Sequence, residues 1–187
     1  ILHHQQGQLP EAEGLYRLVL EADPDHADAM HLMGVIAHQV GRNDVATVFI
    51  GEAIRRNGAV PAYHSNLGNV QLQLGHRDVA IASYREAIRL NPGYAEAHYN
   101  LANLLAEQGQ IDDAIAGFHA ALTTNPRYVD AHNNLGNVLH DAGRIEEAIA
   151  SYREAVRLNP GHVQAHSNLG NALREPVSYT HLRAHET

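Results

Sequence analysis

Asparagines recur in this 187-residue chain as pairs three residues apart, and the pairs repeat at a step of 34 residues. An amide side chain both donates and accepts hydrogen bonds, so it can hold a peptide backbone without selecting its side chains. Residues three apart share one face of a helix, which places both amides of a pair on the same surface. The candidate peptide-binding residues are Asn66, Asn69, Asn100, Asn103, Asn134, Asn137, Asn168 and Asn171.

The same asparagines have a second interpretation, which the sequence leaves open. Amides at a regular step can bond from one repeat to the next and stabilise the array without any ligand. Peptide binding is favoured by spacing, because rungs about 10 Å apart would meet an extended peptide at roughly every third residue.

Histidines form another ladder at the same step, and they raise the question of a metal site. Zinc requires ligand atoms at about 2.0–2.1 Å, whereas equivalent helices of a stacked array lie about 10 Å or more apart. Neighbouring imidazoles therefore cannot share an ion, so we interpret them as packing groups and expect no bound metal. The ladder consists of His64, His98, His132 and His166.

The remaining chemistry-bearing residues do not assemble into a catalytic pattern. The serines face no evident His–Asp partner, and the glycines lack a phosphate-binding loop signature. Paired acids such as Asp112 and Asp113 begin predicted helices, where negative charge favours the helix dipole. Cysteine is absent, which excludes disulfides and thiolate chemistry and leaves the compartment undecided. We expect no catalytic residue, no cofactor and no enzyme activity in this chain.

The charge and hydropathy of the chain argue against two classes of partner. Thirteen arginines and no lysine stand against twenty-one acidic residues, giving a net charge of −8. An acidic chain gains little from counterion release, so we expect no nucleic-acid partner. No apolar run approaches the roughly 20 residues that cross a bilayer, so we expect no membrane partner. A protein or peptide ligand remains, and the sequence leaves homo-oligomerisation open.

A 34-residue period must position all of these side chains. Each unit predicts two amphipathic helices: in 95–128, Gly109 separates them as a left-handed stop, and Pro126 ends the second. One such pair cannot bury its own apolar face, so neighbouring pairs must stack. Small residues mark the closest helix contacts at Gly34, Gly68, Ala102, Gly136 and Gly170.

These residues resemble the tetratricopeptide repeat (TPR) family. Within each repeat, Leu with Gly or Ala, then Gly, Ala, an aromatic residue, Ala and Pro follow the family's spacing. The resemblance implies an all-α fold, a right-handed α-solenoid of antiparallel helix pairs (a TPR superhelix), with the asparagines on its concave side. Repeat 27–60 departs from the pattern, because Ile50 replaces the aromatic residue and Gly58 the proline.

The resemblance also divides the chain into segments. We expect a partial first repeat, mainly its second helix, at 1–26 and the first helix of a truncated repeat at 163–176. Complete repeats are expected at 27–60, 61–94, 95–128 and 129–162.

One binding mode of the family is not expected here. Its carboxylate clamp uses lysine and arginine at positions 2, 5 and 6 of the repeat, and this chain has no cation at those positions. Position 2 holds Asp28, Ala62, Glu96, Asp130 and Gln164, and position 5 holds His31, Ser65, Tyr99, Asn133 and Ser167.

A looser resemblance joins the runs AYHSNLGN and YREAIRLNPGYAEAHYNLANLL to the N-terminal arm of bacterial SPINDLY-type O-linked N-acetylglucosamine transferases. It implies that the asparagines deliver protein substrates to a glycosyltransferase domain further along the parent chain. Leu32 and Val35 occupy the asparagine positions of repeat 27–60, so the ladder would begin one repeat later. A third alternative is a structural scaffold that assembles through its convex face.

The period stops at Pro176. The following residues, 177–187, have the sequence VSYTHLRAHET and are similar to a translated transposase-type sequencing adapter. We expect this tail to be non-native and leave it out of the functional interpretation.

Overall fold

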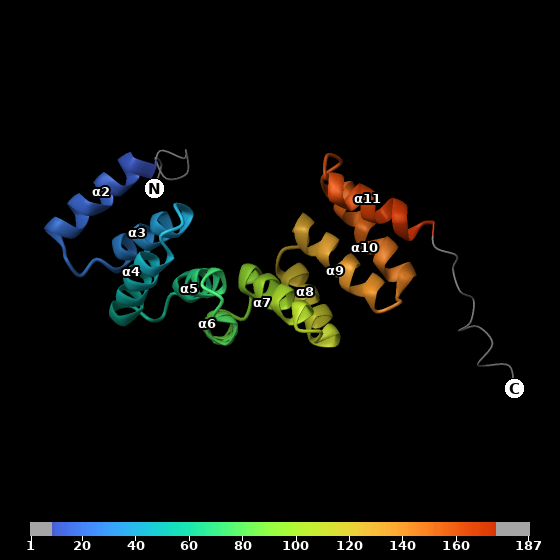
Figure 1. The fold of residues 1–187 in the computed structure, drawn as a ribbon, viewed down its shortest axis with the longest axis horizontal. Helices are drawn as coiled ribbons and strands as arrows, with labels where there is room; N and C mark the ends of the chain where they lie inside the picture. The colour runs from blue at the N-terminus through green and yellow to red at the C-terminus, as the bar shows by residue number, and fades with distance from the viewer. Residues whose placement is uncertain (1–8, 175–187) are drawn as a thin grey trace, which may run out of the picture. The chain divides into compact units, whose positions relative to one another are not determined.

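The structure is a computed structural model that describes residues 9–174. Within that range all regular structure is α-helical, which confirms the expected all-α fold class (Figure 1). The predicted adapter tail at 177–187 lies outside the described residues, as do the first eight residues of the predicted segment 1–26. The helices are Leu9–Ala22 (α2), Ala27–Gln39 (α3), Asn43–Arg56 (α4), Pro61–Gln73 (α5), Arg77–Leu90 (α6), Ala95–Glu107 (α7), Ile111–Thr124 (α8), Val129–Asp141 (α9), Ile145–Leu158 (α10) and Val163–Ala172 (α11).

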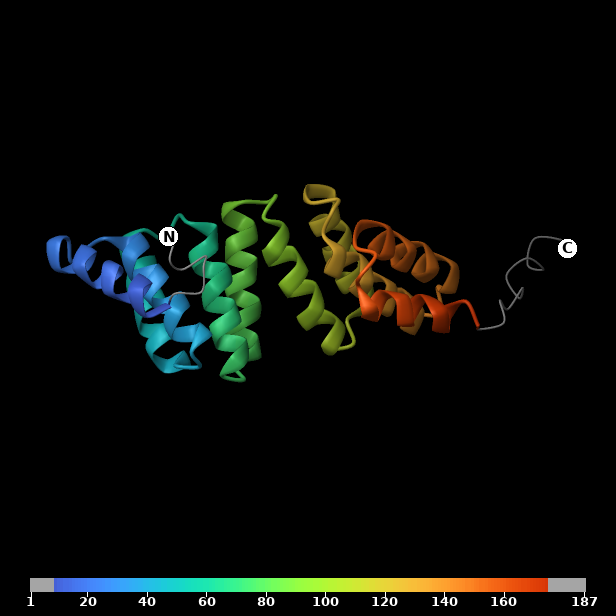
Figure 2. The same cartoon turned by 90° about the horizontal axis from the view of Figure 1, so that it is seen from above.

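Consecutive helices pack as antiparallel pairs joined by short turns. Helix α3 packs against α4, α5 against α6 and α9 against α10, and the members of each pair lie side by side in both views (Figure 1, Figure 2). The turn inside a pair contains a glycine with φ between 74 and 80°, a conformation that only glycine adopts at no steric cost. Gly109 is one of these, so its predicted role as a left-handed stop is confirmed.

The turn between pairs is fixed by an asparagine and by the proline that follows it, as at Asn125 and Pro126. Helix α8 ends at Thr124, and Asn125 leaves the helix with φ −125° and ψ 84°, as expected for a residue before proline. The Asn125 Oδ1 then accepts a bond from the backbone N–H of Arg127 at 3.2 Å. This local bond explains why asparagine recurs at this point of the repeat.

The chain divides into two compact units, Ile1–Leu101 and Ala102–Thr187, with the division inside α7. In the first unit, the fully buried Ala46, Ile50 and Val70 form one apolar cluster across α4 and α5. In the second unit, Leu139 and the ring of Phe118 are fully buried. Among residues 9–174, no helix combines the length and apolar character needed to cross a membrane.

The first helix of a pair approaches the second so closely that position 8 of the repeat, which is Gly68 or Gly136, has little room for a side chain. A Cβ atom added to Gly68 would lie 2.5 Å from the Tyr84 ring, and one added to Gly136 would lie 2.5 Å from the Tyr152 ring. The hydroxyl of Tyr84 is itself held by a hydrogen bond, so this ring cannot easily move aside. Where the chain has Ala102 at this position, the opposing ring is Phe118, which has no hydroxyl to hold it.

We predict that Gly68→Ala lowers the free energy of unfolding by about 1–3 kcal/mol, because the added methyl group overpacks the contact with Tyr84. The double variant Gly68→Ala/Tyr84→Phe should lose less than the sum of the two single variants, since it recreates the Ala102–Phe118 combination. Urea denaturation followed by circular dichroism measures both.

Gly51→Ala is the matched control for this prediction. Gly51 lies within α4, and an added Cβ would meet nothing within 4 Å. Alanine should therefore stabilise this helix by about 0.5–1 kcal/mol. Equal effects of the two alanine substitutions would contradict the packing argument.

Candidate functional site

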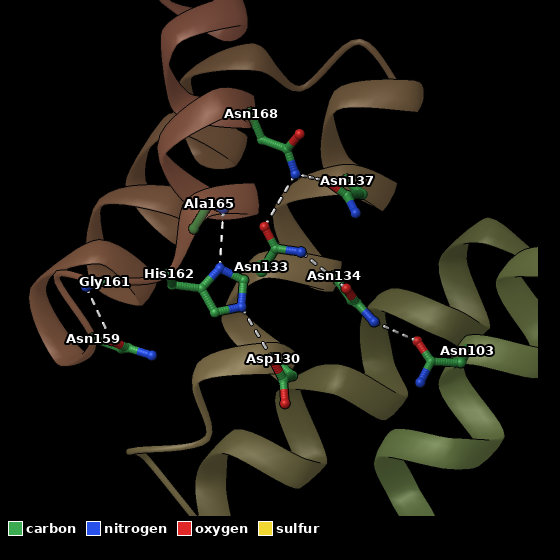
Figure 3. A network of polar contacts seen from close by, with 10 residues as sticks. All are labelled: Asn103, Asp130, Asn133, Asn134, Asn137, Asn159, Gly161, His162, Ala165 and Asn168. Atoms are coloured by element: carbon green, nitrogen blue, oxygen red, sulfur yellow. Dashed lines mark hydrogen bonds and ion pairs between the residues drawn. The ribbon is translucent and has the colours of Figure 1, made fainter.

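The asparagine ladder is joined by hydrogen bonds between successive first helices. In each case the Nδ2 of the asparagine at position 6 donates to the Oδ1 of the asparagine at position 9 of the preceding repeat. We call each such bond a rung. The rungs are Asn100 to Asn69 at 3.0 Å in the first unit, and Asn134 to Asn103 and Asn168 to Asn137, both 2.8 Å, in the second (Figure 3).

Tyrosines on the second helices fix the acceptor of two rungs. The Tyr84 hydroxyl donates to Asn69 Oδ1 at 2.8 Å, and the Tyr152 hydroxyl donates to Asn137 Oδ1 at 2.9 Å. The carbonyl oxygens of Asn69 and Asn137 thus each accept two bonds, which fills both of their lone-pair directions. Sequence reasoning identified an aromatic residue at this position only as part of the repeat pattern and missed these hydroxyl bonds.

The ladder extends one repeat further than its asparagines, through a histidine. Asn66 lies opposite a repeat with Val35 at position 9, which cannot accept a bond. Its Nδ2 instead contacts the His31 Nε2 at 2.8 Å, and the His31 ring stacks on Tyr63 with centroids 4.4 Å apart. The sequence signal for this contact is weak, because His31 shares position 5 with residues of unrelated chemistry.

Position 5 also contributes in the second unit. Asn168 donates a second bond to the Asn133 Oδ1 at 3.0 Å, and the Asn133 Nδ2 donates to the Asn134 Oδ1 at 3.1 Å (Figure 3). Asn133 is buried, and it was not among the predicted site residues. In the second unit the structure therefore joins Asn103, Asn134, Asn137 and Asn168 in one hydrogen-bonded network through Asn133, which periodicity alone did not single out.

Each rung uses either the oxygen or the nitrogen of an asparagine amide, and in several residues the other atom makes no hydrogen bond. Asn69, Asn103 and Asn137 accept through Oδ1, and within residues 9–174 their Nδ2 groups donate no hydrogen bond. Asn66 and Asn100 donate through Nδ2, and their Oδ1 atoms accept none in the same range. All five side chains are half-buried, and Asn171 is exposed. The ladder therefore carries unused donors at position 9 in both units, but unused acceptors at position 6 only in the first unit. In the second unit the position-6 oxygens already accept, that of Asn134 from Asn133 and that of Asn168 from Gln164.

The histidine ladder makes a different set of bonds. Each Nε2 lies 2.8–3.0 Å from a backbone carbonyl six residues earlier, in the turn that precedes its helix. The four contacts are His64 to Gly58, His98 to Pro92, His132 to Pro126 and His166 to Pro160. Among the described residues no group of three or more His, Asp or Glu side chains is arranged to hold a metal ion. These imidazoles bridge each first helix to the turn before it.

A polar cavity lies on the asparagine face of the second unit. Its volume is about 380 Å³. It is lined by Asn137, His140, Asp141, Tyr152, Gln164, Asn168 and Asn171, which come from α9, α10 and α11. The rung between Asn137 and Asn168, drawn in Figure 3, therefore joins two residues that line this cavity.

We predict that Asn137→Ala lowers the free energy of unfolding by about 1–3 kcal/mol, because it removes the shared acceptor of Asn168 and of the buried Tyr152 hydroxyl. Thermal unfolding monitored by circular dichroism measures the change. Asn171→Ala is the control: its amide makes no hydrogen bond within the described residues, so the melting temperature should stay unchanged. A melting temperature for Asn137→Ala equal to that of the parent would show that the rung does not stabilise the array.

The buried tyrosines have altered acidity. Burial, and secondly the negative charge of Glu96, raise the pKa of Tyr84 well above its usual value of 10.0. Burial, followed by the hydrogen bond to Asp28, raises the pKa of Tyr63 in the same direction. Tyr94 is affected less, with its pKa raised to about 12 by burial and by Glu96.

We predict that stability falls as the pH rises above about 10. The unfolded tyrosines lose their protons there while the folded ones keep them, so the unfolded state binds fewer protons and is favoured increasingly. The stabilising effect is complete below pH 10 and is lost toward the raised pKa values of the folded state. Melting temperatures of the parent and of Tyr84→Phe between pH 8 and about 11 measure this, and the variant should show the smaller decline.

Comparison with protein families matches residues 65–117, 101–163 and 141–175 to the family described as "Tetratricopeptide repeat". Together the matches span more than half of the chain. A search of curated proteins finds no match.

Solved structures that resemble this chain include the following three. The crystal structure of MamA is 22% identical with a TM-score of 0.72, covering 84% of this chain and 92% of MamA. YrrB, described as a TPR protein with an unusual peptide-binding site, is 25% identical with a TM-score of 0.68, covering 89% of this chain and 86% of YrrB. TTC0263, a thermophilic TPR protein of Thermus thermophilus, is 21% identical with a TM-score of 0.74, covering 91% and 93%. None of these names describes an enzyme.

Proposed function

Since this chain belongs to the tetratricopeptide repeat family, we propose that it is a protein-interaction module whose asparagine face binds an extended peptide segment. The face consists of the eight asparagines at positions 6 and 9: Asn66, Asn69, Asn100, Asn103, Asn134, Asn137, Asn168 and Asn171.

The orientation of the amides supports this proposal most directly. Each residue of a peptide backbone offers one N–H donor and one carbonyl acceptor. The rungs leave Nδ2 donors at position 9 of both units, as at Asn69, and Oδ1 acceptors at position 6 of the first unit, as at Asn100. A peptide carbonyl can therefore accept a bond from the Nδ2 of an asparagine at position 9, and a peptide N–H can donate to the Oδ1 of an asparagine at position 6. The rung and the peptide contact use opposite ends of the same amide, so structural bonding and peptide binding do not compete.

The polar cavity supports the same proposal in the second unit. It borders the rung between Asn137 and Asn168, and its volume of about 380 Å³ accommodates part of a peptide. The half-buried state of the amides favours binding as well, because a hydrogen bond shielded from water is stronger than an exposed one. Similarity to YrrB, which is described as having a peptide-binding site, is compatible with this function.

The double variant Asn103→Asp/Asn137→Asp tests the proposal. Aspartate keeps the acceptor oxygen that each rung requires and replaces the unused Nδ2 donor by a second acceptor. We predict an unchanged melting temperature and an affinity for an uncharged glycine-, serine- and glutamine-containing peptide that is about tenfold lower, equivalent to about 1.4 kcal/mol. Fluorescence anisotropy with a labelled peptide measures the dissociation constant.

Asn125→Asp/Asn159→Asp is the matched control. Both residues lie in exposed turns of the same unit, and each accepts a backbone N–H through Oδ1 that aspartate would retain. This variant changes the net charge equally and should bind the peptide like the parent. Equal loss in both double variants, or no loss in either, would refute binding through the asparagine face.

A second candidate function follows from the resemblance of AYHSNLGN and the neighbouring repeats to SPINDLY-type arms. In that case the asparagine face would deliver protein substrates to an O-linked N-acetylglucosamine transferase domain of the parent protein. The decisive observation is the parent gene: this function requires a glycosyltransferase domain encoded downstream of residue 176.

A further inference from the structure

Charge is segregated between the two kinds of helix. The first helices of the pairs, α3, α5, α7, α9 and α11, contain neither arginine nor lysine. Every arginine between residues 9 and 174 lies on a second helix, in a turn, or after the end of α11. The first helices carry five acids, which are Asp28, Glu96, Glu107, Asp130 and Asp141.

Two arginines of the second unit have acidic partners on α10: Arg157 lies on this helix and Arg144 in the turn before it. Arg144 bonds Glu147 at 2.6 Å, and Arg157 bonds Glu154 at 2.5 Å, so these positive charges are balanced on and beside α10. Arg174 follows α11, and its Nε donates to the carbonyl of Gly170 at 3.2 Å.

The acids of α9 have a different environment. Asp130 lies 3.2 Å from His162, and Asp141 lies 3.8 Å from His140, and these imidazoles are cations only when they are protonated. The carboxylates remain largely accessible, with the side chain of Asp130 62% exposed and that of Asp141 76% exposed. The asparagine face of the second unit is therefore negative when these histidines are neutral.

The position of these two acids on α9 relates them to the peptide path. They are about three helical turns apart, which places them on the same side of the helix with Asn134 and Asn137 between them. Asp141 also lines the polar cavity. A backbone that is held by the amides and crosses α9 would thus have a carboxylate on either side of it.

We infer that the asparagine face of the second unit selects a basic peptide, an extended segment with lysine or arginine side chains that reach Asp130 and Asp141. The inference rests on the proposed function, because the amides hold the backbone while the two carboxylates choose the side chains. Three observations support it: the cavity bordered by Asp141, the absence of arginine and lysine from α9 and α11, and the exposure of both acids.

Three labelled peptides test this inference on the full chain. They share a glycine–serine frame and carry lysine, glutamine or glutamate at every third residue. We expect the lysine peptide to bind about tenfold more tightly than the glutamine peptide at low ionic strength, and the glutamate peptide to bind more weakly than both. The lysine advantage should shrink as salt is raised above about 0.1 M, where the Debye length falls below about 10 Å.

The double variant Asp130→Asn/Asp141→Asn should lower the affinity for the lysine peptide to that for the glutamine peptide. Its affinity for the glutamine peptide should stay within about twofold of the parent. The matched control is Asp113→Asn/Glu146→Gln, which changes the net charge equally at exposed positions of α8 and α10. The control should retain the full preference for lysine.

Equal binding of the lysine and glutamate peptides would overturn the charge selection while leaving peptide binding intact. A control variant that loses the lysine preference as fully as the α9 variant would also overturn it, because the overall charge of −8 would then be the cause. Failure of all three peptides to bind would instead overturn the proposed function and this inference with it.

Discussion

The arrangement of the asparagine face depends on one hydrogen bond, from the Nδ2 of one asparagine to the Oδ1 of another in the preceding repeat. In an array whose pairs contact only their neighbours, this bond fixes how one first helix lies against the next. It also orients each amide, since the donor turns its Nδ2 end and the acceptor its Oδ1 end toward the partner asparagine. The rung between Asn168 and Asn137, at 2.8 Å, thus determines both the packing of α11 and the chemistry of the cavity beside it.

The rung is coupled to the core through a tyrosine and a glycine. The Tyr152 hydroxyl holds the Asn137 Oδ1, which fixes the ring, and the ring in turn leaves no room for a Cβ at Gly136. The packing of three positions is therefore coupled: glycine at position 8, asparagine at position 9 and tyrosine at position 24. The repeat with Ala102 and Phe118 shows the alternative, in which the asparagine acceptor loses its hydroxyl donor and the methyl group is accommodated.

The sequence predicted the fold well because periodicity, glycine turns and inter-pair prolines act locally. Gly109 and Asn125 end their helices through their own backbone preferences, which need no knowledge of the rest of the chain. The site was less predictable. Periodicity placed the asparagines on a common face, but it could not tell which amide end each rung would use. Periodicity also could not predict the contact between His31 and Asn66. That contact depends on which side chain of the preceding repeat comes within 2.8 Å of the Asn66 amide.

The segregation of charge has a physical explanation in the same geometry. A cation on a first helix would compete for the amide oxygens at position 6 and for the carboxylates of α9, and it would repel a basic ligand. Arginines on the second helices avoid this competition, since glutamates such as Glu154 on the same helix balance their charge locally. Such exposed pairs contribute little to stability, typically about 0–1 kcal/mol, so their placement is not explained by folding alone. Their effect is to leave the asparagine face without arginine or lysine, a composition that would distinguish ligands by charge after the backbone has been bound.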